Sequence, residues 1–114
     1  MASRLKLILG VFLAIALAAC GEYGKIYKSK DSQAKYKLAM SLYEEKNFSK
    51  AVPLFEQLRD AYRNNLDSLE DVYIRSAYSY FYMKDYEYAS MFFKDFTDNF
   101  SRSSRMTECA YMAL

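Results

Sequence analysis

The chain has 114 residues, of which 53% are hydrophobic, 18% aromatic and 26% charged, a balance typical of one folded domain. Histidine is absent, which excludes Ser-His and Cys-His nucleophile systems and histidine metal sites. All three glycines precede residue 25 and there is one proline, which argues against a β fold built on tight hairpin turns.

The first segment, residues 1–19, has the features of a lipoprotein signal peptide. Arg4 and Lys6 precede an uncharged apolar run, Leu7 to Ala19, that is shorter than the ~18 residues of a membrane-spanning helix. The run leads into Leu17-Ala18-Ala19-Cys20-Gly21, which resembles the bacterial lipobox, where cleavage precedes a cysteine that then receives lipid. We expect lipidation of Cys20; an ordinary secretory signal with an incidental thiol is the alternative.

Residues 20–30 are expected to form a linker behind the anchor. Cleavage removes Arg4 and Lys6, so the net charge falls from +2 to zero, and no overall field would attract nucleic acid. Five lysines in and after this linker are candidates either for contact with anionic lipid headgroups or for simple solvation: Lys25, Lys28, Lys30, Lys35 and Lys37.

The remaining chain contains an internal repeat with an offset of 38 residues. The segment from Ser41 to Ala51 recurs from Ser79 to Ala89, with Lys46/Lys84 identical inside it, and Phe55/Phe93 and Asp60/Asp98 are identical beyond it at the same offset. In each copy, apolar residues step by three and four, as Ala51, Leu54, Phe55 and Leu58 do. Each copy is therefore predicted to end in an amphipathic helix.

Each of these helices is preceded by another, at roughly residues 32–45 and 70–83. Asp67 stands three residues ahead of Glu70 and predicts a capping box for the second. Turns are expected at Asn47, Asn64-Asn65, Asp85 and Asn99, where asparagine and aspartate would supply the left-handed backbone that glycine usually provides.

Small residues at Ala39, Ala51, Ala77 and Ala89 match the close-packing positions of the tetratricopeptide repeat. The predicted fold is therefore all-α, a short α-solenoid of stacked helical hairpins behind a signal peptide. We expect repeat 1 over 31–65, repeat 2 over 66–102 and the start of a truncated repeat 3 over 103–114. Because eight or so residues make a marginal helix alone, we expect the sequence to be the amino-terminal part of a longer protein. Cys109 is expected to be a small buried apolar residue.

The mature chain resembles the BamD family of lipoproteins from the outer-membrane β-barrel assembly machinery, in the form found in Bacteroidetes. The resemblance rests on short motifs: Cys20-Gly21-Glu22-Tyr23, Lys35-Tyr36, Ala51-Val52-Pro53-Leu54-Phe55-Glu56, Glu70-Asp71-Val72-Tyr73, Tyr88-Ala89-Ser90-Met91-Phe92-Phe93-Lys94 and Thr107-Glu108-Cys109-Ala110-Tyr111-Met112. The sequence departs from the family at Arg75-Ser76, which interrupts a usual run of tyrosines. It also lacks the later repeats that resemble the docking site for the barrel-forming subunit.

No catalytic chemistry is predicted. The adjacent carboxylates at Glu44-Glu45 and Glu70-Asp71 point about 100° apart on a helix, and no phosphate loop, metal-ligand cluster or cofactor site can be assembled. The first helix of each repeat should instead line a peptide-binding groove, to which the register assigns Tyr36, Met40, Tyr43, Ile74, Tyr78 and Phe81. For Met40 and Ile74, filling the gap between repeats is an equal alternative.

The resemblance implies a non-catalytic, lipid-anchored protein of the cell outer membrane that faces the periplasm. Its expected partners are unfolded outer-membrane proteins, the barrel-forming subunit of the assembly machinery and the membrane itself, without nucleic acid. The alternative is a generic tetratricopeptide envelope scaffold or a glycan-binding lipoprotein.

Overall fold

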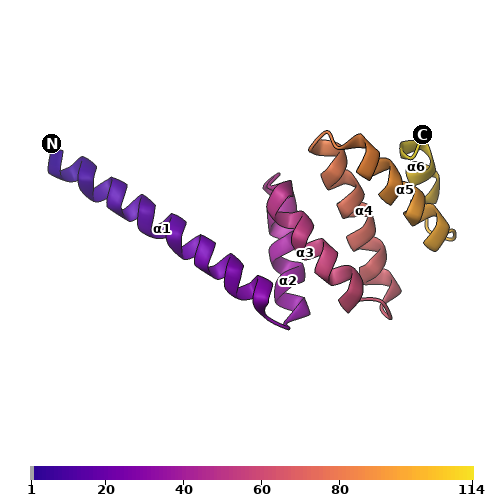
Figure 1. Cartoon of the computed structure of the whole chain (residues 1–114), viewed down its shortest axis with the longest axis horizontal. Helices are drawn as coiled ribbons and strands as arrows, with labels where there is room; N and C mark the ends of the chain where they lie inside the picture. Colours follow the sequence, from indigo (N-terminus) through magenta and orange to yellow (C-terminus); the bar gives the residue numbers. More distant parts are fainter. Residues whose placement is uncertain (1) are drawn as a thin grey trace. The chain divides into compact units, whose positions relative to one another are not determined.

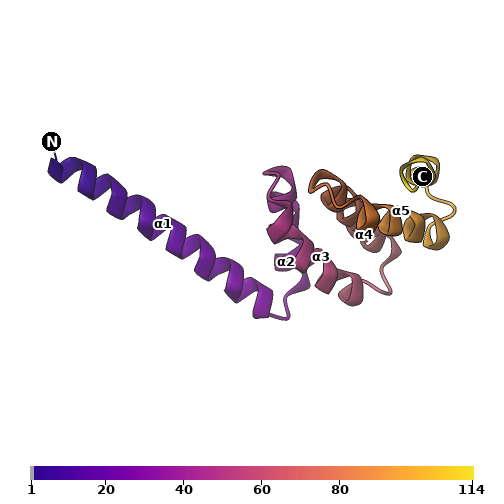
Figure 2. The ribbon, with the colours of Figure 1, turned by 45° about the horizontal axis from the view of Figure 1, so that its top comes forward.

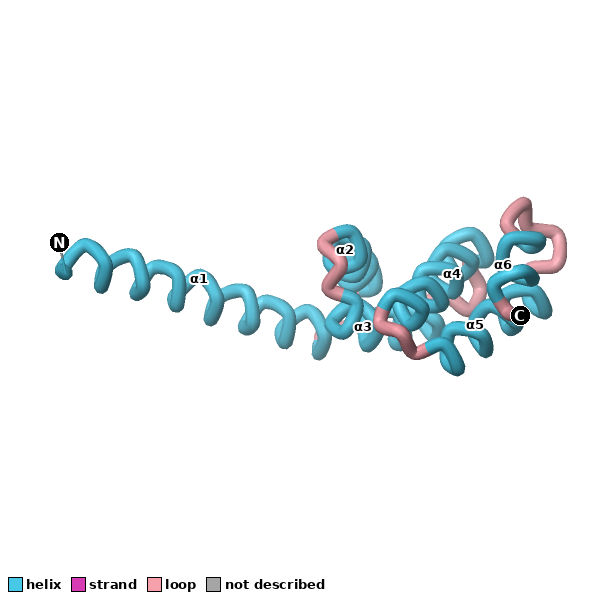
Figure 3. Tube along the Cα trace, turned by 90° about the horizontal axis from the view of Figure 1, so that it is seen from above, coloured by secondary structure: helices cyan, strands magenta, loops and turns pink. Residues whose placement is uncertain are grey.

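The computed structural model describes residues 2–114, except for the side chains of Ala2 and of residues 12–20. Every regular element within residues 2–114 is an α-helix (Figures 1 and 3), which confirms the all-α prediction. The chain divides into two compact units, with the boundary between Asp31 and Ser32. The first holds α1 (Ala2–Lys28), and the second holds α2 (Ser32–Glu44), α3 (Phe48–Ala61), α4 (Leu66–Tyr82), α5 (Tyr86–Asn99) and α6 (Met106–Met112).

The first unit is a single helix of 27 residues that continues beyond position 20. Ser29 ends it, because the Ser29 amide and hydroxyl both donate to the Ile26 carbonyl, at 3.1 and 2.7 Å. Most of the segment expected to be a linker is therefore helical, and only residues 29–31 lie between the end of α1 and the start of the second unit.

The second unit consists of two helical hairpins and one further helix. The helix α2 packs on α3, and α4 packs on α5 (Figures 1 and 2). Contacts between α3 and α4 join the two hairpins, and contacts between α5 and α6 join the second hairpin to the last helix. Short connections separate the helices (Figure 3), as expected for a helical repeat stack.

The core follows the apolar period of the sequence. The alanines at the four close-packing positions are almost completely buried, at 0 to 2% exposed, which lets the paired helices approach. The large side chains between them are also buried: Leu54, Phe55 and Leu58 from α3, and Phe92, Phe93 and Phe96 from α5. Cys109 of α6 is fully buried beside the α5 phenylalanines, which confirms that it is an apolar packing residue.

The turns within the hairpins differ from the sequence-based prediction. Lys46 and Lys84 adopt the left-handed backbone, with φ of 64° and 66°, whereas Asn47 and Asp85 follow them at φ of −90°. In the first turn the Lys46 amide donates to the Tyr43 carbonyl and the Asn47 amide donates to the Leu42 carbonyl. This is the double hydrogen bond of a Schellman C-cap, whose geometry requires the left-handed residue at the lysine position.

The start of α4 also differs from the prediction. It begins at Leu66, with Asn65 as the N-cap residue, whose side chain accepts from the Ser68 amide at 3.4 Å. The capping box predicted at Asp67 was therefore wrong, because Asp67 lies inside the first turn. Glu70 therefore has no role in a capping box, and its carboxylate accepts a hydrogen bond from the Ser103 hydroxyl near the start of α6.

Candidate peptide-binding face

The helices α2, α4 and α6, the first of each repeat, are tied together by tyrosine hydroxyls. Tyr36 of α2 donates a hydrogen bond to the carboxylate of Asp71 in α4. The same carboxylate accepts from Nε of Arg75, one turn later, at 3.0 Å. The Arg75 guanidinium also lies 5.1 Å from the centre of the Tyr43 ring, within the range of a cation–π contact. One polar cluster thus joins the first two repeats.

A similar cluster joins α4 to α6. Tyr78 donates a hydrogen bond to the carboxylate of Glu108, which also pairs with Arg105 at 2.9 Å. The guanidinium of Arg105 lies 6.0 Å from the centre of the Tyr78 ring. Each junction between first helices therefore combines a tyrosine, a carboxylate and an arginine.

These contacts change the acidity of the groups involved. Partial burial, and then the hydrogen bond to Asp71, raise the pKa of Tyr36 to about 12. Burial and the hydrogen bond to Glu108 likewise raise the pKa of Tyr78. The pKa of Glu108 is lowered, first by its hydrogen bond from Arg105 and then by that from Tyr78. At neutral pH both tyrosines are therefore protonated donors and Glu108 is a charged acceptor.

Four rings form a continuous row across both repeats, which we call the aromatic row: Tyr43, Phe48, Tyr82 and Tyr78. Tyr43 meets Phe48 edge to face at 5.5 Å, and Phe48 stacks on Tyr82 at 5.2 Å with 24° between the planes. Tyr82 then stacks on Tyr78 at 6.0 Å. The Tyr82 side chain is 54% exposed, so the row presents aromatic surface to solvent although its rings support one another.

A hollow of about 530 Å³ opens at this row. Its lining joins three rings of the row to two residues of opposite charge: Tyr43, Phe48, Tyr82, Glu44 and Lys46. All five come from the turn ends of the two hairpins, so the left-handed turn at Lys46 helps to shape the hollow. The arrangement offers an apolar surface for a ring and charged groups beside it.

The structure distributes the six residues assigned to the groove among different environments. Tyr43 and Tyr78 belong to the aromatic row, and Phe81 lies edge to face against Tyr82 at 5.6 Å. Tyr36 is partly buried, with its hydroxyl bonded to Asp71, and Met40 is half-buried. The assignment of Ile74 to the groove was wrong, and the structure supports the alternative given for it. Ile74 is 2% exposed in the core formed with α5, so it fills the space between helices and presents no surface to a ligand.

Sequence reasoning missed two rings of the row, Phe48 and Tyr82. Tyr82 follows Tyr78 by one helical turn, a spacing that places both side chains on the same side of α4. Phe48 lies in the second helix of its repeat, and only the folded hairpin brings it to the end of the first. The i, i+4 pair could have been recognised from sequence, whereas the Phe48 contact could not.

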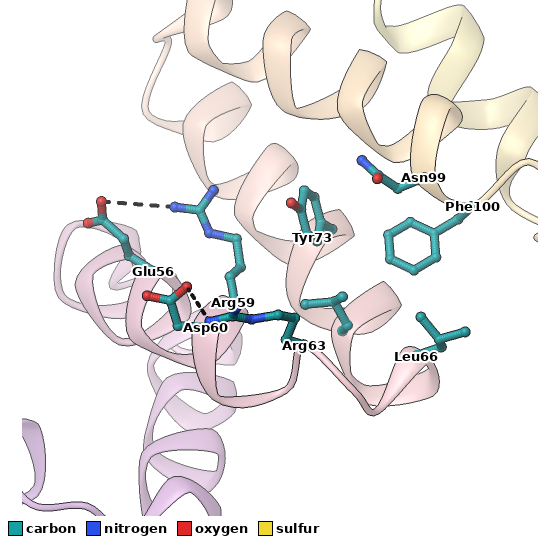
Figure 4. Close-up of a pocket in the computed structure, with 9 residues that line it drawn as sticks. Glu56, Arg59, Asp60, Arg63, Leu66, Tyr73, Asn99 and Phe100 are labelled. Atoms are coloured by element: carbon teal, nitrogen blue, oxygen red, sulfur yellow. Dashed lines mark ion pairs between the residues drawn. The ribbon is translucent and has the colours of Figure 1, made fainter.

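A second hollow, of about 650 Å³, lies at the end of the hairpins where α3 leads into α4 (Figure 4). Arg59 and Arg63 line it, each 3.9 Å from a carboxylate one turn earlier in the chain, at Glu56 and Asp60. The Arg59 guanidinium lies 4.5 Å from the centre of the Phe92 ring, and its Nε is buried without a hydrogen-bond partner in the described part of the chain. Because each of the two arginines is paired with a carboxylate, this hollow has little net charge with which to select a ligand.

The lipidation predicted at Cys20 falls on a side chain that lies outside the described residues. No helix in the described part of the chain is both long enough and apolar enough to cross a bilayer. No cluster of potential metal ligands occurs among the described side chains.

Comparison with known families gives a match to the model YfiO, described as outer membrane lipoprotein, over residues 28–114. The chain belongs to the YfiO family. This assignment confirms the resemblance to BamD-type lipoproteins and supports an outer-membrane location. The YfiO match covers the whole helical-repeat unit and so includes every residue of the aromatic row. No curated protein and no solved structure matched the chain.

Proposed function

We propose that the chain is a BamD-type lipoprotein of the Bacteroidetes form, anchored through lipid on Cys20 and facing the periplasm. In this role it binds segments of unfolded outer-membrane proteins for the β-barrel assembly machinery, whose barrel-forming subunit is its second partner. It acts by capture and has no catalytic step. Membership of the YfiO family supports the general assignment.

The observation that carries the binding proposal is the aromatic row with its hollow. A volume of about 530 Å³ falls within the ~300–1,000 Å³ of small-ligand sites and accommodates one large side chain of a peptide. An exposed ring such as Tyr82 can bury a client's aromatic residue while its hydroxyl stays in water. Glu44 and Lys46 leave the hollow without net charge, but the Lys46 ammonium would still donate to a carboxylate, as at the end of a chain.

This site differs in composition from the groove expected from sequence. Tyr43, Tyr78 and Phe81 remain candidate contacts, joined now by Phe48 and Tyr82. Tyr36 and Met40 would contribute at the rim, and Ile74 would act only through the core.

Fluorescence anisotropy with a labelled peptide that ends in an aromatic residue tests the binding site. Truncation of an anchoring ring costs at least about 2 kcal/mol, so Tyr82→Ala and Phe48→Ala should each weaken binding about thirtyfold. The control is Tyr88→Ala, because Tyr88 is similarly exposed but stacks on Tyr80 instead of joining the row. Equal affinity for all variants would place client binding elsewhere.

Lipidation is tested separately by metabolic labelling with a fatty acid. Wild type should incorporate label and Cys20→Ala should not, because the acylated thiol would be missing. Label that persists on the alanine variant would refute anchoring through Cys20 without bearing on the aromatic row.

A further inference from the structure

The last two turns of α1 carry two tyrosines on one side. Tyr23 and Tyr27 are four residues apart, and their rings stack with centres 6.2 Å apart and planes 12° apart. Position 20 lies three residues before Tyr23 in the same continuous helix. With 3.6 residues per turn, positions 20, 23 and 27 share one side of the helix. Position 20 therefore lies on the side of the helix that carries the two tyrosines.

Three of the other residues at this end of α1 are charged: Glu22, Lys25 and Lys28. Lys25 lies about 160–200° around the axis from the two tyrosines, on the opposite side. Lys28 lies in the last turn, about 100° from Tyr27, and Lys30 follows the helix end. Three lysines against one carboxylate, Glu22, give residues 21–30 a positive charge although the mature chain is neutral overall.

We propose that residues 21–28 form a membrane-surface helix whose Tyr23 and Tyr27 side lies in the headgroup layer of the bilayer that holds the lipid on Cys20. The inference rests on the lipid anchor proposed above. Tyrosine rings favour the interface between headgroups and acyl chains, and the flexible stems of Lys28 and Lys30 reach anionic headgroups around them. Since the anchor holds this segment at the bilayer, the amphipathic side needs only to orient it.

The chain contains no tryptophan, so a single tryptophan is a unique fluorescent probe. The mature chain, beginning at Cys20, would be coupled through that thiol to a maleimide-bearing phospholipid in vesicles of phosphatidylcholine and phosphatidylglycerol. Cys109 is fully buried and its thiol pKa is raised to about 11, so coupling is directed to Cys20. Quenching by lipids brominated on their acyl chains then reports the depth of the probe.

Tyr27→Trp should be quenched at least about twofold more strongly than Lys25→Trp, because interfacial helices bury only one side. Adding Tyr23→Asp to the Tyr27→Trp chain should reduce the quenching, and replacing phosphatidylglycerol with phosphatidylcholine should reduce it too. Equal quenching at positions 25 and 27, or none at either, would overturn the membrane-surface helix.

Chemical coupling makes this result independent of cellular acylation. A Tyr27→Trp chain that is quenched in vesicles supports the membrane-surface helix even if fatty-acid labelling fails in cells. Conversely, fatty-acid labelling in cells together with equal quenching at positions 25 and 27 would support the lipid anchor and refute the membrane-surface helix.

Discussion

The hydroxyl of Tyr78 in α4 donates a hydrogen bond to the carboxylate of Glu108 in α6, 30 residues later in the chain. The Tyr78 ring also lies edge to face against Phe93, with the ring centres 5.0 Å apart. One side chain thus links two repeats through its hydroxyl while its ring packs on the core. Removal of the hydroxyl alone separates these contributions.

Tyr78→Phe should lower the free energy of unfolding by up to about 1 kcal/mol, since it removes one partly exposed hydrogen bond and keeps the ring. Urea denaturation followed by circular dichroism measures the change. Tyr111→Phe is the matched control, because Tyr111 is 75% exposed and its loss of a hydroxyl should leave the midpoint unchanged. If the two variants have the same stability, the Tyr78 bond to Glu108 contributes nothing.

Stability should decline in acid partly through Glu108. Because its folded pKa is lowered, its contribution is present above the ordinary pKa of a glutamate and disappears as the pH falls through the folded value. Glu108→Gln removes the charge and keeps an acceptor, so its stability should vary less with pH between neutrality and pH 3 to 4. Urea midpoints over this range test it, with the exposed Glu45→Gln as control. Parallel curves for wild type and Glu108→Gln would contradict the assignment.

The left-handed turn at Lys84 should be improved by glycine. A residue with a Cβ is strained at a φ of 66°, so Lys84→Gly should raise the free energy of unfolding by roughly 0.5–1 kcal/mol. Lys94→Gly, inside α5 and exposed, should instead lower it by about 1 kcal/mol. Thermal unfolding of both variants tests this prediction. A loss of stability for Lys84→Gly would show that the Lys84 side chain makes a compensating contact.

The two hairpins offer a paired test of helix capping. Asp85 accepts a hydrogen bond from the Tyr88 amide at 3.4 Å, whereas Asn47, at the equivalent position, makes no such bond. Asp85→Ala should therefore cost about 1 kcal/mol and Asn47→Ala only a few tenths. Urea unfolding of the two variants under the same conditions provides the comparison, and the reverse order would be inconsistent with the caps described.

Cys109 should be inert in the folded protein. Burial raises its pKa to about 11, so almost no thiolate exists at pH 8, and the sulfur is inaccessible to a reagent. Ellman's reagent should react with this thiol only after urea is added, on a chain in which Cys20 has been replaced by alanine. Rapid reaction without urea would mean that α6 separates readily from α5.

The periodicity of the apolar residues was sufficient to predict the core of α3, because the buried side of an amphipathic helix follows the spacing of its apolar residues. Leu54, Phe55 and Leu58 occupy the predicted side of α3 and are all buried. The left-handed residues could not be chosen correctly from propensity, since their position is fixed by where the preceding helix ends. Lysine therefore adopts this conformation at positions 46 and 84, although asparagine or aspartate follows immediately.

The candidate site was only partly predictable for a different reason. The repeat register identified Tyr36 and Tyr78, but their acceptors lie 35 and 30 residues away, on helices that become neighbours only when the repeats stack. The register also placed Ile74 toward the groove, whereas the packing of α4 against α5 buries it. The spacing of residues along one helix predicts which of them share a side of that helix. Only the contacts between helices determine whether that side is buried or faces the groove.

The polar links between successive first helices do not follow the 38-residue repeat. At that offset Tyr36 corresponds to Ile74, and Asp71 corresponds to Cys109, so neither partner of the first junction recurs in the second. A duplicated first repeat would present Gln33 where Asp71 accepts from Tyr36, and the junction would lose its carboxylate. The repeats are thus not interchangeable modules: their backbones are alike, and their order along the chain is specified by side chains at the junctions.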